Sequence, residues 1–198
     1  MYEAFVALCM GVGLSAAAGF RIFLPPFLLS LVIKFGNLNL NLEGTSFEFF
    51  ESDITIFLLG AAVIAETLGY YIPWVDNLLD SVATPAAIIA GTGMTAMLLG
   101  EEMNPVLQWS LAIIAGGGVS AGIQGATVVT RGASTVVTGG VGNPIVSTIE
   151  NIAALFFALF ALILPFLAAF GAVLLLAFAI KKMIDRGMST GKNSLQSE

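Results

Sequence analysis

Long apolar runs separated by short polar segments dominate the chain. The runs cover residues 4–33, 54–72, 77–99, 106–129 and 152–180. A helix needs roughly 20 residues to cross the hydrocarbon core of a bilayer, and the runs meet or approach that length. The pattern therefore predicts an all-α fold, a polytopic transmembrane helix bundle of about five or six spans.

Two of these runs are expected to be broken. Pro25 and Pro26 interrupt the first run, and a proline inside a helix removes a backbone hydrogen bond and clashes with the preceding turn. We expect two half-helices there. As a single helix the last run would be about 43 Å long, against a hydrocarbon core of about 30 Å. A kink at Pro165 or Gly171, or a strong tilt, is therefore needed.

The stretch at 115–151 is rich in glycine and carries Arg131, an Asn-Pro pair and Glu150. Broken backbone with charged side chains between apolar helices is how membrane proteins build polar pathways. We expect this stretch to be a broken or re-entrant element whose free backbone N–H groups face a ligand.

Charge distinguishes the two sides of the membrane. Residues 37–53 carry four acidic residues and no lysine or arginine, whereas cytoplasmic loops are enriched in lysine and arginine. This acidic segment is expected outside, as a short hairpin or an interfacial segment. The tail after residue 180 holds four of the seven basic residues, which places the C-terminus in the cytoplasm. If each apolar run crossed the membrane once, the acidic segment could not lie outside while the C-terminus lies inside. A half-crossing, an extra crossing in 115–151 or a break in the last run is therefore required.

Two pairs of segments suggest an internal repeat. Residues 11–17 align with 116–122 at an offset of 105, with four of seven positions identical, and 75–81 resembles 141–147 at an offset of 66. Many transporters consist of two halves that are inverted in the membrane, with the binding site between them. The alternative is that helices rich in small residues look alike by composition.

Composition supports a membrane protein and excludes several functions. Hydrophobic residues make up 58% of the chain and charged residues 10%, compared with about 25% charged residues in soluble domains. We expect one transmembrane domain over 1–186, with repeat halves 1–100 and 101–186, and a polar cytoplasmic tail over 187–198. Without histidine and with Cys9 alone, the chain offers no usual metal site, and we expect no cofactor. No basic patch indicates nucleic acid, and no signature of an enzyme is found.

The ionisable groups deepest in apolar sequence are Arg21, Glu66 and Glu150. A charge in the middle of the bilayer costs about 2.5–3.5 kcal/mol on insertion scales, so each group should have a partner. One arginine with two carboxylates suits a polar path, in which Glu66 and Glu150 handle protons. The alternatives are a structural ion pair of Arg21 with Glu66, or snorkelling to an interface.

Arg131 follows the polar end of the fourth run. Together with free N–H groups at a helix start it would attract an anion; alternatively it is an ordinary cytoplasmic loop arginine. Asn143, Ser147 and Glu150 are spaced to share one helix face. We expect that face to point into the bundle, where Arg21, Arg131, Asn143 and Ser147 bind substrate.

Polar residues near position 75 have local explanations. Asp76, Asn77, Asp80 and Ser81 lie around a predicted helix start, where acids favour the positive helix end. We prefer capping to a cation site there. Tyr70, Tyr71 and Trp74 match an aromatic belt at the membrane interface.

The runs Gly13 to Arg21 (GLSAAAGFR) and Ser120 to Arg131 (SAGIQGATVVTR), with Gly142-Asn143-Pro144 and Glu150-Asn151, resemble an uncharacterised bacterial membrane family, the domain of unknown function DUF4126. The resemblance covers nearly all of the chain before the tail. It implies a multi-pass protein of the bacterial inner membrane and transfers no catalytic role.

These observations favour a small transporter or permease for an anionic solute or lipid phosphate, with proton coupling. The alternative is a non-transporting membrane scaffold or assembly subunit, and a lipid-modifying enzyme would need a nucleophile that the chain does not show. Expected partners are membrane lipids and a small anionic solute or lipid headgroup. A homo-oligomer is a further possibility.

Overall fold

The computed structural model describes residues 2–36, 38, 40, 42–100 and 103–195, with side chains other than those of 73, 74, 183 and 185–195. The described residues form helices and turns, without a strand. The helices are α1 (Tyr2–Phe20), α2 (Leu24–Phe35), the 3₁₀ helix η1 (Glu48–Glu51), α3 (Asp53–Gly69), α4 (Pro73–Leu99), α5 (Pro105–Leu111), the π-helical η2 (Ala112–Gly117), α6 (Gly118–Thr138), α7 (Asn143–Ile163) and α8 (Pro165–Leu195). The predicted all-α fold is confirmed.

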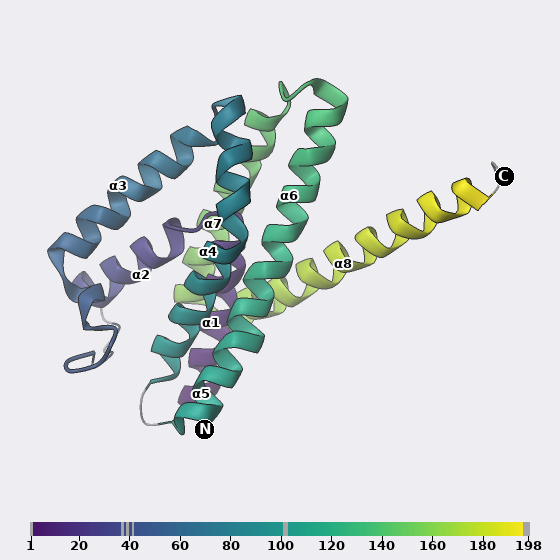
Figure 1. Cartoon of the computed structure of the whole chain (residues 1–198). Coiled ribbons are helices and arrows are strands. Elements are labelled where there is room, and N and C mark those ends of the chain that lie inside the picture. Colours follow the sequence, from purple (N-terminus) through teal and green to yellow (C-terminus); the bar gives the residue numbers. More distant parts are fainter. Residues whose placement is uncertain (1, 37, 39, 41, 101–102, 196–198) are drawn as a thin grey trace.

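Helix α1 is the centre of the bundle. It contacts α4, α6, α7 and α8, and every residue of 9–19 is buried, as expected for a helix that is apolar all round. Helices α2 and α3 lean to one side, and α8 projects from the other (Figure 1). Among the described residues, five helices are long and apolar enough to cross a membrane. The chain is a multi-pass membrane protein.

The first apolar run is broken, as expected. Helix α1 ends at Phe20 and α2 begins at Leu24, with Pro25 in its first turn, where the missing N–H of proline has no partner to lose. The chain then turns back. Leu42 and Phe50 of the acidic segment belong to the same core cluster as Met10 in the middle of α1 and Leu98 near the end of α4. The acidic segment lies toward the end of the bundle where the chain starts (Figure 1). Its described part forms turns and η1, not a hairpin of strands.

The glycine-rich stretch is helical from 115 to 138 and is broken only at the 139–142 turn, so the expected broken or re-entrant element over 115–138 is wrong. Helices α5, η2 and α6 form one continuous helix from Pro105 to Thr138, with a π-helical turn inside it, and the chain reverses only at residues 139–142. There Gly139 and Gly140 adopt φ of 65° and 91°, a conformation that glycine reaches without strain. The helix survives because its glycines allow neighbouring helices to approach closely. Its backbone groups are therefore used within the helix and are not free for a ligand.

The two segments that align in sequence run in the same direction. A Cβ at Gly11 of α1 or at Gly116 of η2 would in each case meet the side chain of Thr95 of α4. Further along both helices, Arg21 and Arg131 meet at Glu150. Helices α1 and α6 are therefore parallel, and α4 and α7 run the opposite way (Figure 1). These matched segments are not inverted relative to each other.

The last apolar run is two helices. Helix α7 ends at Ile163 and α8 begins at Pro165, because proline cannot continue the hydrogen-bonding of the preceding turn. This break supplies the extra change of direction that the charge pattern required. Helix α8 then leaves the bundle, and only 11% of its most apolar stretch is buried.

Candidate functional site

Two arginines lie buried in the bundle with one carboxylate between them. Arg21 follows the end of α1 and is 1% exposed, and Arg131 of α6 is 2% exposed. Glu150 of α7 accepts a hydrogen bond from Arg21 Nη1 at 3.0 Å and from Arg131 Nη2 at 2.6 Å, both on Oε2. Arg131 Nε also donates to both carboxylate oxygens, at 3.2 and 3.1 Å. The carboxylate of Glu150 therefore pairs with the guanidinium groups of both Arg21 and Arg131.

A second carboxylate and an aromatic ring complete this cluster. Asp80 of α4 accepts from Arg131 Nη1. The ring centroid of Tyr70, at the end of α3, lies 4.3 Å from Arg21 Cζ and 3.9 Å from Arg131 Cζ, a distance at which ring and cation attract. Buried charges need such pairing to offset the loss of water. We call Arg21, Tyr70, Asp80, Arg131 and Glu150 the arginine cluster.

The remaining donors of Arg21 contact α7 and its own helix end. Nε donates to Asn151 Oδ1, Nη2 to the carbonyl oxygen of Ser147 at 3.0 Å, and Nη1 also to the carbonyl oxygen of Phe20 at 2.9 Å. The guanidinium thus gives a partner to the carbonyl of Phe20, one of the last carbonyls of α1, which have no partner within a helix. Arg21 thus connects the break in the first run to the first half of α7.

Asn143 lies two turns before Glu150 on α7, and Ser147 lies one turn before it. Asn143 Nδ2 donates to Asp76 Oδ2 at 2.7 Å and to Thr135 Oγ1 at 3.0 Å, and its Oδ1 has no hydrogen-bond partner in the described part of the chain. Ser147 Oγ donates to the carbonyl oxygen of Tyr70 at 3.2 Å. The shared face of α7 points into the bundle, as expected.

Glu66 lies apart from the arginines' hydrogen bonds. It is 5% exposed, and its two carboxylate oxygens accept from the backbone N–H of Ile22 at 2.8 Å and of Phe23 at 3.1 Å. The carboxylate therefore caps the broken end where α2 begins, where both orphan N–H groups and the helix dipole favour an anion. The ion pair of Arg21 that the structure contains is with Glu150, not with Glu66.

We expect Glu66→Gln to lower the free energy of unfolding by about 1–2 kcal/mol, because the amide keeps one acceptor and turns a donor toward the second N–H. Hydrogen exchange read by mass spectrometry should quicken over residues 20–28, with Glu43→Gln in the exposed acidic segment as the matched control. Unchanged exchange over residues 20–28 would show that the cap does not hold the start of α2.

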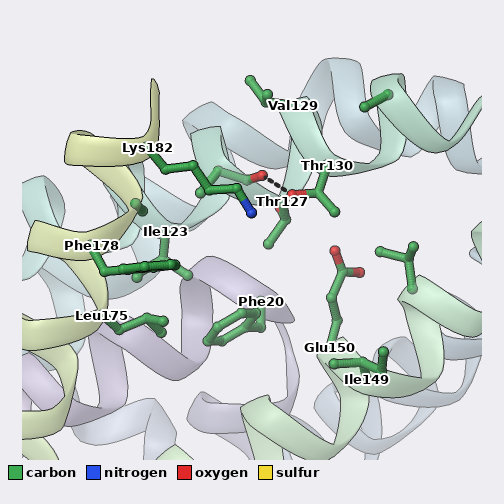
Figure 2. Close-up of a pocket in the computed structure, with 14 residues that line it drawn as sticks. Phe20, Ile123, Thr127, Val129, Thr130, Ile149, Glu150, Leu175, Phe178 and Lys182 are labelled. Atoms are coloured by element: carbon green, nitrogen blue, oxygen red, sulfur yellow. Dashed lines mark hydrogen bonds between the residues drawn. The ribbon is translucent and has the colours of Figure 1, made fainter. Parts of the chain in front are cut away.

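A cavity of about 330 Å³ reaches the arginine cluster from the side. It lies between α6, α7 and α8, and Phe20 forms its inner wall. Figure 2 shows the carboxylate of Glu150 and the ammonium group of Lys182 pointing into the same space. Glu150 is the only member of the arginine cluster that lines this cavity. The group that binds both arginines is thus also the one that faces the cavity.

The structure brings Arg21, Arg131, Ser147 and Glu150 together, whereas Asn143 lies two turns from Glu150 and pairs with Asp76. Reasoning from the sequence missed Tyr70, Asp80 and Asp76, because an aromatic belt and helix capping explained them locally. Charge balance was the signal available for Asp80. Two buried arginines need two carboxylates, and Asp80 is spaced one turn after Asp76 on the same helix. The ordinary loop position considered for Arg131 does not hold, since Arg131 is buried.

Comparison with known proteins places the chain in a family. The model for a domain of unknown function, DUF4126, matches residues 8–184. The chain belongs to the DUF4126 family. The match begins within α1 and ends within α8, and it includes every residue of the arginine cluster. No curated protein and no solved structure matches the chain.

Proposed function

We propose that this DUF4126 protein is a permease that moves an anion together with a proton across the membrane. The observation that carries the proposal is the position of Glu150. Its carboxylate holds Arg21 and Arg131 and at the same time lines the cavity. Behind the carboxylate of Glu150, an anion in the cavity therefore finds two guanidinium groups. These groups are already arranged to bind an anion.

Protonation of Glu150 is the proposed switch. The charged carboxylate occupies the place between the guanidinium groups that a substrate anion would take. A proton on Glu150 removes its negative charge and weakens both ion pairs, so an anion can replace it on Arg21 and Arg131. Guanidinium groups suit this exchange because they bind carboxylates and phosphates with paired N–H donors. One proton then moves with each anion.

The other candidate residues have supporting roles in this proposal. Asn143 and Ser147 line the same face of α7 toward the end of the bundle with the 139–142 turn, and Asn143 Oδ1 stays available as an acceptor. Their contact with substrate is a prediction. Glu66 remains a second candidate for proton coupling, since protonation would release its hold on the N–H groups of Ile22 and Phe23.

We place the protein in the bacterial inner membrane with the 139–142 turn and the C-terminus on the cytoplasmic side. The basic residues that follow the apolar part of α8 support this side. The acidic segment lies toward the opposite end of the bundle, on the side where α1 begins (Figure 1). This orientation follows from the charge distribution alone and does not depend on an inverted repeat.

Liposomes that contain a pH-sensitive dye test the proposal. With inorganic phosphate or dihexanoyl phosphatidic acid added outside, protein-containing liposomes should acidify inside faster than empty ones. Glu150→Gln should remove this acidification, because the variant cannot carry the proton. Lys34→Gln is the control, since Lys34 pairs with Asp53 at the exposed acidic segment.

A second variant keeps the test clear if Glu150→Gln does not fold. Ala126→Trp fills the cavity wall without a change of charge, and it should also stop acidification. The proposal fails if neither probe produces acidification with the wild type, or if folded Glu150→Gln acidifies as the wild type does.

A membrane scaffold is the second candidate, and the projecting helix α8 favours it. Phe170, Leu174 and Phe178 of α8 are more than half exposed, which suits a partner helix as well as lipid. A scaffold would purify with a stable protein partner and show no acidification with either probe.

A further inference from the structure

The walls of the cavity are those of a site for an amphiphile. Most of the lining residues are apolar, among them Phe20, Ile123 and Phe178. The hydroxyl groups of Thr127 and Thr130 donate to carbonyl oxygens of their own helix at 2.8 Å. A small hydrated anion would lose water there and gain few hydrogen bonds in return. A hydrocarbon chain would gain burial along the same walls.

The charges of the cavity differ in how well they are compensated. The negative charge of Glu150 is held by two arginines. Lys182 is the other charged residue of the lining, it is exposed, and no ion pair within 4 Å includes it in the described part of the chain. Its Nζ lies 5.9 Å from the ring centroid of Phe178. The lining therefore presents one charge without an ion-pair partner in the described part of the chain, and that charge is positive.

The position of Lys182 matches the depth of a lipid headgroup. The apolar run of α8 ends at Ile180 and Lys181 and Lys182 follow it directly, so Lys182 stands just past the end of this run. Lysine side chains at such ends extend to the interface, where they attract anionic headgroups. From this rim the cavity runs inward along α8 to Phe20 and Glu150 (Figure 2). Because little of Pro165–Lys182 is buried, we expect lipid to surround this part of α8 and to reach the cavity from the side.

We propose that this cavity binds an anionic phospholipid, with the headgroup phosphate on Lys182 and one acyl chain along Phe20, Leu175 and Phe178. The volume of about 330 Å³ lies at the lower end of the range for small-molecule sites, which fits one chain and not a whole lipid. The lipid site itself does not depend on the proposed permease. Only the step that makes this lipid the transported substrate rests on the proposed function. It makes the transported anion a lipid phosphate that arrives from within the membrane.

Native mass spectrometry of the purified full chain tests the lipid site. The protein is titrated with phosphatidylglycerol or with phosphatidylcholine of the same acyl chains, and bound lipids are counted. Lys182→Glu should weaken phosphatidylglycerol binding on the order of tenfold, whereas phosphatidylcholine binding should change little. Lys181→Glu is the matched control, because Lys181 makes the same charge change one residue away and does not line the cavity. Ala126→Trp should remove binding of both lipids.

Equal effects of Lys181→Glu and Lys182→Glu would overturn the inference, as would equal affinity of the wild type for the two lipids. A lipid-free dimer that Ala126→Trp dissociates would instead make a second copy of the chain the occupant. Phosphatidylglycerol binding that depends on Lys182, without acidification in the liposome assay, would keep the lipid site and reject the permease. Acidification with inorganic phosphate alone, without lipid binding, would keep the permease and reject the lipid site.

Discussion

Glu150→Gln is expected to lower the free energy of unfolding by about 3–5 kcal/mol, the usual result when one partner of a buried ion pair is removed. The substitution keeps the shape of the side chain but leaves Arg21 and Arg131 buried with Asp80 as their only remaining carboxylate partner among the hydrogen bonds of the cluster. For a chain of this length the loss corresponds to a fall in melting temperature of roughly 6–20 °C. Thermal unfolding in one mild detergent, followed by intrinsic fluorescence, measures it.

Two further variants identify the cause of this loss. Glu51→Gln removes an exposed carboxylate from η1 and should leave the melting temperature unchanged within about 1 °C. Arg131→Gln should destabilise the wild type strongly but cost less in the Glu150→Gln background, because the pair is already broken there. Simple addition of the two losses would mean that Glu150 and Arg131 do not stabilise each other.

The part of this cluster that can be predicted from the sequence is the part that follows from the cost of burying a charge. Arg21 and Glu150 lie in apolar sequence, and such groups must find partners, so their convergence follows from composition and spacing. Arg131 is ambiguous because its neighbours are polar. Tyr70 and Asp80 need the fold itself, since each has a sufficient local explanation at a helix end. Which helices lie side by side is decided by packing over the whole bundle, and local preference does not contain that information.

The glycines of 115–151 are a second case in which local preference does not predict the structure. Glycine weakens a helix by about 1 kcal/mol relative to alanine when only the backbone is considered, and on that basis broken backbone is expected. In a bundle the missing side chain lets two helices touch, and the packing gained outweighs the local loss. Gly91 and Thr95 of α4 lie against Gly116 and Ser120, so glycine here marks a contact and not a break.

Gly116→Ala is therefore expected to be strongly destabilising, by about 3 kcal/mol, near the upper end of the usual cost of overpacking. A Cβ at Gly116 would lie 2.5 Å from the carbonyl oxygen of Gly91, and closer still to Thr95 Oγ1. Backbone atoms cannot turn aside as a flexible side chain can, so α4 and η2 would have to separate. The melting temperature in detergent should fall by roughly 6–12 °C.

Gly118→Ala, two residues further along the same continuous helix, is the matched control. A Cβ there would meet nothing within 4 Å, and alanine favours the helix, so the variant should be neutral or more stable by up to about 1 kcal/mol. Opposite effects from the same substitution would separate close packing from helix preference. Equal effects would mean that α4 and η2 are not held this closely, and the arrangement that brings Asp80 of α4 to Arg131 of α6 would then need revision, because it depends on the same helix contact.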